Sequence, residues 1–302
     1  MKIQTDKTAI KGFLFAILAA ALWGVSGTFG QFLFQERDID VTWLITARLQ
    51  VSGILLLLYA RFREKADIFS IWRDKKSTIN LLIFSITGML AVQYTYFAAI
   101  KHSNAATATI LQYAGPIIIA VYLAIKYRRL PQPKELFAIF LAVLGTFLLV
   151  TQGKFNSLSI SPIALFFGLA SAVALAIYTL QPKELLSKYR ASVVIGWAML
   201  CGGIAISFIK APWNVDGVWD IYSYLYTGLI IIFGTLVAFT LYLYAVKVIG
   251  GQKASLLASA EPLAATIVSV YWLQITFTLT DWIGSLCIIF TVFLLGKGNQ
   301  KI

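Results

Sequence analysis

Long apolar stretches, separated by short polar segments, run through the whole chain. An apolar helix of about 20 residues spans a bilayer, and a backbone in lipid must satisfy its own hydrogen bonds, so such stretches are helical. The expected spans cover residues 11–34, 41–60, 78–100, 104–125, 135–150, 161–180, 192–210, 221–246, 252–273 and 280–296. The pattern therefore predicts an all-α membrane protein with ten transmembrane helices.

The amino-acid composition is typical of a membrane protein. Of 302 residues, 59% are hydrophobic and 13% are charged, whereas about 25% of the residues of a soluble domain are charged. The first apolar run follows basic residues, as in a signal peptide, but it continues beyond 20 residues. We therefore expect it to be a retained first span of a multi-pass protein.

A net charge of +12 would suggest nucleic acid as the partner of a soluble protein, but here Lys and Arg alternate by loop. If the N-terminus is cytoplasmic, the loops on the opposite side hold only Arg37, Lys101, Lys154 and Lys210. An excess of basic residues marks the cytoplasmic side of a membrane protein. The sequence thus predicts cytoplasmic N- and C-termini and no nucleic-acid partner.

The chain repeats itself at an offset of 146 residues. The segment YTYFAAIKHSNAATATILQYAGP at 94–116 aligns with TLYLYAVKVIGGQKASLLASAEP at 240–262, pairing Tyr96 with Tyr242. Five spans in each copy force the second copy to enter the membrane from the opposite side. We expect two inverted five-helix repeats, residues 1–153 and 154–302, an architecture typical of secondary transporters.

Motifs for other chemistries are missing from the sequence. It contains no nucleotide-binding loop, no spacing typical of metal ligands and no catalytic triad pattern. Cys201 and Cys287 fall within spans, where small apolar packing is the expected role. The sequence therefore predicts a protein that is not an enzyme and that has no cofactor and no metal site.

Several segments carry a resemblance to a known family: LWGVSGTFGQ at 22–31, TARLQVSGILLLL at 46–58, GMLAVQYTYFAAI at 88–100, NAATATILQYAGP at 104–116 and ASLLASAEPLAA at 254–265. The chain resembles the EamA-type ten-helix transporters of the drug/metabolite transporter superfamily, most closely the carboxylate, amino acid or amine transporter group. The resemblance implies a bacterial plasma (inner) membrane protein that moves small metabolites, mostly out of the cell and often in exchange for protons.

One departure limits that transfer. Many EamA members carry a glycine-glutamate pair where the fourth and ninth helices end, but the matching segments here read KYRRL at 126–130 and WLQIT at 272–276. A role that this glutamate has in relatives is therefore not carried over to this chain.

Glu261 and Pro262 interrupt the apolar segment 252–273. Glu261 lies about nine residues, roughly 14 Å, into the span, near the midplane of a hydrocarbon core about 30 Å thick. Two interpretations stay open: Glu261 exchanges a proton during transport, or it remains neutral and binds the backbone that Pro262 loosens. The equivalent positions in the first repeat are Gly115 and Pro116, so we expect both prolines to be structural hinges and the acid to be the asymmetric element.

Arg48 is a second charge within a span, and arginine cannot become neutral by losing its proton. Three interpretations compete. Arg48 pairs with Glu261 or another acceptor, it clamps a substrate carboxylate, or its guanidinium extends to the membrane interface.

Other polar and aromatic side chains are expected at similar depth, where together with Arg48 and Glu261 they are interpreted as substrate-binding. They are Trp23, Gln93, Tyr94, Gln112, Tyr113, Tyr178, Trp197 and Tyr242. Such a pocket suits an aromatic amino acid or a cation over the rings, and packing is the alternative role for each aromatic. Gly24, Gly27 and Gly30 beside Trp23 suit close helix packing or a backbone site exposed to substrate.

These patterns predict a secondary transporter that exports small metabolites, such as amino acids, amines or related compounds, by alternating access. If transport is coupled to an energy source, we expect that source to be proton movement through Glu261. The alternative is a passive channel or facilitator for small solutes, which requires a continuous polar path. The identity of the substrate, the direction of transport and the choice between monomer and homodimer stay open.

Overall fold

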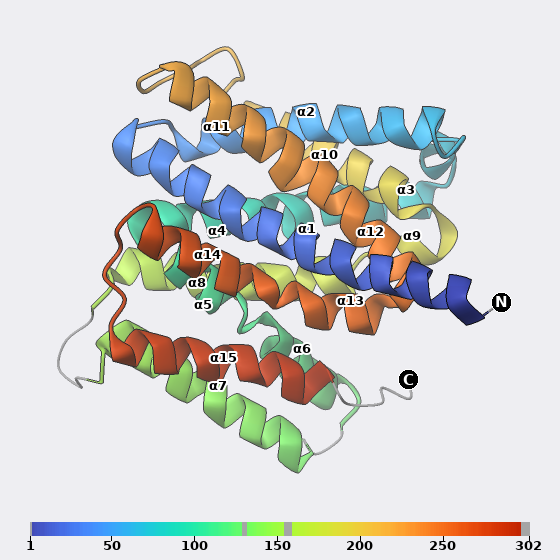
Figure 1. The fold of residues 1–302 in the computed structure, drawn as a ribbon. Helices are drawn as coiled ribbons and strands as arrows, with labels where there is room; N and C mark the ends of the chain where they lie inside the picture. The colour runs from blue at the N-terminus through green and yellow to red at the C-terminus, as the bar shows by residue number, and fades with distance from the viewer. Residues whose placement is uncertain (1, 129–131, 154–158, 297–302) are drawn as a thin grey trace.

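A computed structural model of the chain describes residues 2–128, 132–153 and 159–296 (Figure 1). All regular secondary structure in these ranges is helical. The first half contains α1 (Lys2–Glu36), α2 (Val41–Phe62), η1 (Ser70–Arg73), α3 (Lys75–Ile83), η2 (Phe84–Leu90), α4 (Ala91–His102), α5 (Ala105–Gln112), α6 (Gly115–Lys126) and α7 (Pro133–Thr151). The second half contains α8 (Pro162–Leu180), α9 (Lys183–Lys188), α10 (Ala191–Ser207), α11 (Ile221–Ile231), η3 (Ile232–Val237), α12 (Ala238–Ile249), α13 (Gly251–Ala258), α14 (Ala260–Tyr271) and α15 (Leu279–Gly296).

These helices account for the ten expected spans. Among the described residues, six continuous segments are long and apolar enough to cross a membrane: Ala9–Glu36, Val41–Phe62, Lys75–His102, Ala105–Lys126, Pro162–Lys188 and Ile221–Ile249. Shorter apolar helices fill three more spans, at Leu136–Thr151, Ala191–Ser207 and Leu279–Thr291. The remaining span consists of α13 and α14 together. The prediction of an all-α membrane protein with two five-helix repeats is confirmed.

Contacts between the helices follow the internal repeat. The second spans of the two halves, α2 and α10, pack on each other, and so do the fifth spans, α7 and α15, which lie side by side in Figure 1. The first span of each half crosses to the other half: α1 packs on α12, α13 and α14, and α8 packs on α4, α5 and α6. The first span of each half therefore packs within the helices of the other half.

Two spans that the sequence predicts as continuous are broken, at equivalent places. The fourth span is interrupted at Tyr113 and Ala114, between α5 and α6, and the ninth at Ser259, between α13 and α14. Ser259 follows Tyr113 by the 146 residues of the repeat. Pro116 and Pro262 lie in the first turn of the helices that follow these breaks, where a missing N–H leaves no helical bond unmade.

A second irregularity also repeats. The third span changes to a π-helical turn at η2, and the eighth does so at η3. A π-helical turn rearranges the backbone hydrogen bonds of an α-helix and is often found at functional sites. The helix breaks and the π-turns therefore give the two repeats irregular backbone at matching places.

Candidate functional site

Tyr113 joins the two helix breaks. Its hydroxyl lies 2.6 Å from the carbonyl oxygen of Ala258, to which it donates, and 3.1 Å from Oε2 of Glu261. Tyr113 ends the first half of the fourth span, whereas Ala258 and Glu261 flank the break in the ninth. One phenol therefore connects the two repeats at the position where each loses its helical hydrogen bonds.

Glu261 lies in the first turn of α14. The free N–H groups at a helix N-terminus favour negative charge nearby, typically by about 0.3–1 kcal/mol. The half-helix thus gives the carboxyl group a setting that tolerates ionisation at a depth where lipid would not. Broken helices that direct their ends at a central site are a recurring device of secondary transporters.

Arg48 binds the π-turn of the opposite repeat. Its Nε donates to Oγ1 of Thr235 at 2.7 Å and its Nη2 to the carbonyl oxygen of Gly234 at 3.2 Å. The guanidinium also lies over the ring of Phe97, 5.0 Å from its centroid. Only 4% of Arg48 is exposed, so the interpretation that it extends to the membrane interface is wrong.

Among the described residues, no ion pair joins Arg48 to Glu261, although the two interact electrostatically. The acceptors of Arg48 are the hydroxyl and carbonyl of η3 instead. Because a guanidinium has five N–H donors, two hydrogen bonds leave donors for a ligand. The clamp for a substrate carboxylate stays a prediction.

Tyr96 interacts with both charges, although it is not among the predicted pocket residues. Its hydroxyl shares a 2.8 Å hydrogen bond with Oγ1 of Thr109, and it interacts electrostatically with both Glu261 and Arg48. The sequence did contain a signal, because the repeat aligns Tyr96 with Tyr242. Of these two tyrosines, only Tyr242 is among the predicted pocket residues.

The glycine stripe of α1 forms one boundary of this cluster. A Cβ at Gly24 would lie 2.5 Å from the carbonyl oxygen of Glu261, and one at Gly27 would lie 2.5 Å from the hydroxyl of Tyr96. At Gly30 it would lie 2.6 Å from a ring carbon of Phe97. The glycines therefore permit close packing of α1 against the residues that surround both charges.

An aromatic group surrounds Trp23. The Trp23 ring is 5.3 Å from that of Phe239, in an edge-to-face arrangement, and 5.2 Å from that of Tyr242. Tyr242 also interacts electrostatically with Tyr113 and Tyr178. Tyr113 thus contacts Glu261 directly, and Tyr242 interacts with both Tyr113 and the Trp23 ring. The assignment of Trp23, Arg48, Tyr113, Tyr242 and Glu261 to substrate binding stays a prediction.

Four other predicted residues lie on α4, α5 and α8. Tyr178 packs on Phe84, at 5.5 Å between centroids, and Gln112 is buried at the end of α5. Gln93 and Tyr94 are half-buried on α4, and the Tyr94 ring lies edge-on to Phe167 of α8.

Trp197 is placed differently from the prediction. Its Nε1 donates to the carbonyl oxygen of Ile68 at 2.7 Å, and its ring contacts that of Trp72, 5.0 Å away. Both partners belong to the connection between α2 and α3. The indole therefore secures a loop at one end of the bundle and does not join the central cluster.

Polar contacts close the end of the bundle at which α1 finishes. Nε2 of Gln35 donates to the carbonyl oxygen of Ser103 at 2.9 Å and contacts that of Ile100 at 3.3 Å. Arg37 forms an ion pair with Asp220 at 3.0 Å, and Asp220 caps α11. These contacts tie α1 to the third span and to the start of the eighth.

Beneath them lies a cluster of four rings, Phe29, Phe32, Tyr226 and Trp272, here called the aromatic cluster. Its ring centroids are 4.8 to 5.7 Å apart in five pairs. The rings come from α1, α11 and the end of α14. The aromatic cluster therefore packs α1 against α11 and against the residue that follows α14.

Comparison with known proteins agrees with this architecture. A protein of Salmonella typhimurium described as the uncharacterized inner membrane transporter YicL is 40% identical over 295 residues, which cover 96% of this chain and 97% of that protein. The uncharacterized transporter YwfM of Bacillus subtilis is 22% identical over 95% of this chain and 94% of its own length. An uncharacterized transporter of Archaeoglobus fulgidus is 26% identical over 74% of this chain and 77% of its own.

A solved crystal structure shares the fold, with a TM-score of 0.62 and 17% sequence identity over 96% of each chain. The profile of the EamA-like transporter family matches residues 10–151 and again residues 162–297. The two matches correspond to the two repeats of five spans. This membrane protein therefore belongs to the EamA-like transporter family.

Proposed function

We propose that the protein is a secondary transporter of the bacterial inner membrane that exports small metabolites, chiefly carboxylate-bearing ones such as amino acids, by alternating access. Exchange for a proton carried by Glu261 provides the energy. The observation that carries the proposal is the contact of Tyr113 with both Ala258 and Glu261, because it connects an ionisable group to the junction of the two repeats.

The count of hydrogens at this contact supports the proton role. A phenol has one proton to donate, and the shorter distance, 2.6 Å, assigns it to the carbonyl of Ala258. The contact of 3.1 Å with Glu261 is then a complete hydrogen bond only when the carboxyl group carries a proton of its own. Ionisation of Glu261 makes two acceptors compete for one phenolic proton and so loosens the link between the helix breaks.

The surroundings of Arg48 support the substrate class. Arginine recognises carboxylates through paired N–H donors, and Arg48 keeps donors that its two protein partners do not use. Trp23 packs on Phe239 and Tyr242, and Tyr242 interacts electrostatically with Tyr113, the partner of Glu261. These rings offer aromatic surface for the body of such a substrate. A small molecule with one carboxylate and an apolar or amine-bearing body matches this combination.

A cytoplasmic N-terminus would place the end of α1, with Gln35 and Arg37, on the outer side. The contacts made there, together with the aromatic cluster, would then keep the outer side closed. A passive channel would instead need a polar path through this closure. This arrangement favours the transporter over the channel, and the two repeats, divided near residue 153, would rock against each other to open it.

The test uses the full chain reconstituted in liposomes, with substrates chosen from amino acids and amines by thermal-shift screening. Glu261→Gln keeps the size of the side chain but cannot change its protonation. We expect it to abolish uptake driven by a pH gradient while sparing substrate counterflow. Glu36→Gln, the same change at an exposed position, is the matched control and should affect neither.

Retention of gradient-driven uptake by Glu261→Gln would overturn the proton role. Loss of counterflow in a variant with a wild-type melting temperature would instead assign Glu261 to binding. Loss of folding would support the interpretation of Glu261 as a permanently neutral structural group.

A further inference from the structure

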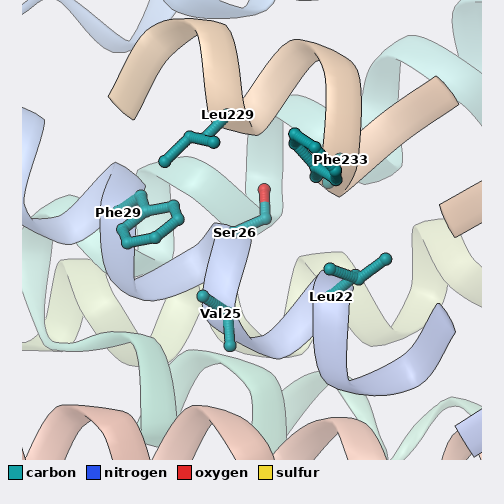
Figure 2. A pocket seen from close by; sticks show the side chains of 7 residues that line it. Leu22, Val25, Ser26, Phe29, Leu229 and Phe233 are labelled. Atoms are coloured by element: carbon teal, nitrogen blue, oxygen red, sulfur yellow. The ribbon is translucent and has the colours of Figure 1, made fainter. Parts of the chain in front are cut away.

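An apolar groove lies between α1 and the α11–η3 segment. Its volume is about 260 Å³. Leu22, Val25 and Phe29 line it from α1, and Leu229 and Phe233 line it from the facing helix, as Figure 2 shows. The two walls belong to different repeats, so whatever fills the groove touches both halves of the transporter.

The groove opens on a surface that faces lipid. Its walls lie within the spans Ala9–Glu36 and Ile221–Ile249. On the same helices Leu18 is 48% exposed, Leu225 49% and Phe233 47%. Exposed apolar side chains within a membrane span contact hydrocarbon. The groove is therefore continuous with the surface that the lipid chains already cover.

The floor of the groove is closed. The missing Cβ of Gly234 leaves a notch that the side chain of Ser26 fills. Ser26 is 3% exposed and its hydroxyl has no hydrogen-bond partner among the described residues. Because that hydroxyl is covered by the packing on Gly234, the surface offered to an occupant is apolar. No charged group from the described part of the chain lines the groove, so the groove does not suit a polar metabolite.

The size of the groove also limits its occupant. It exceeds the roughly 150 Å³ of a cavity that holds benzene, and it is smaller than the roughly 300–1,000 Å³ of sites for drug-sized ligands. An elongated, apolar and narrow occupant fits. In a bilayer the abundant molecule with this chemistry is a lipid acyl chain.

We propose that the groove binds one acyl chain of a bilayer lipid, which stabilises the packing of α1 on η3. The bound chain touches two residues that matter elsewhere. Gly234 provides the carbonyl that accepts from Arg48, and Phe29 stacks on Tyr226 of the aromatic cluster at 4.8 Å. An occupied groove therefore favours the arrangement of the two repeats described here. When the two walls of the groove move apart, the acyl chain is released.

The experiment uses the full chain in nanodiscs containing phosphatidylcholine with a diazirine at the middle of one acyl chain. After illumination, mass spectrometry locates the adducts. We expect adducts enriched at residues 22–29 and 229–233 over the equally lipid-facing Leu14 and Leu18. Leu229→Trp, which fills the groove, should remove that enrichment, whereas the control Leu18→Trp should leave it unchanged.

Uniform labelling of the exposed faces, or labelling of the groove that survives Leu229→Trp, would overturn the proposal. A second arm offers a free diazirine fatty acid of the same length. If only the free acid labels the groove, the occupant is a soluble amphiphile and the proposal fails. It also fails if cross-links within the groove join two copies of the chain. Labelling of the wild type decides the matter even if Leu229→Trp does not fold.

Discussion

Gly24→Ala tests how closely α1 must approach the half-helix that carries Glu261. The added Cβ would lie 2.5 Å from the carbonyl oxygen of Glu261 and 2.8 Å from the backbone nitrogen of Ala265. Ordinary contact begins at 3.4 Å, so the helices must separate by roughly 0.9 Å at this point, and a gap of that size forfeits much of the dispersion attraction. Both obstacles are backbone atoms, which no rotamer change can move.

Overpacking of this kind typically costs about 1–3 kcal/mol. The gain in helix propensity from Gly to Ala, about 1 kcal/mol, works in the opposite direction and must be subtracted. Gly228→Ala measures this propensity gain alone, because Gly228 also lies within a helix and a Cβ there meets nothing within 4 Å. We expect Gly24→Ala to be less stable than Gly228→Ala by about the full overpacking cost, 1–3 kcal/mol.

The assay is reversible unfolding of the purified protein in mixed micelles, followed by tryptophan fluorescence, with transport measured on the same preparations. Gly24→Ala should also lose transport, because displacement of α14 moves Glu261 away from Tyr113. Equal stability of the two variants would refute the close approach of α1 to α14.

Three further predictions concern single side chains. Tyr113→Phe leaves the Ala258 carbonyl without its partner and should lower the free energy of unfolding by about 1–3 kcal/mol. It should also change the pH profile of transport, and a profile identical to that of the wild type would argue against any link between Tyr113 and Glu261. Arg48→Ala should weaken binding of carboxylate-bearing substrates more than that of their amides in thermal-shift titrations; an equal loss for both would contradict the clamp. A hydrogen bond from the Ser223 backbone holds the pKa of Asp220 below its ordinary value. The ionised carboxylate therefore stabilises the fold above the unfolded pKa, and this stability is lost as pH falls through the lower folded pKa. Asp220→Asn should reduce the fall of the melting temperature at acid pH, and an unchanged fall would contradict the role of Asp220 as the cap of α11.

Sequence periodicity determined the spans, because lipid leaves a backbone almost no alternative to the helix. The repeat at 146 residues and the count of five spans per copy then determined the two-repeat architecture. Pro116 and Pro262, at equivalent positions, predicted irregular helices at the right places. Depth within a span also singled out Glu261, since a carboxyl group there needs a special environment.

Only the tertiary structure decided which side chains meet. Arg48 binds Thr235 across the repeats, and periodicity within one helix carries no information about a contact between residues so far apart in the chain. Trp197 and Tyr242 both looked central by depth, yet the indole of Trp197 bonds to a loop carbonyl. The azimuth of a residue around its helix, and hence its partner, depends on how neighbouring helices pack, and that is fixed by the steric fit of the whole bundle.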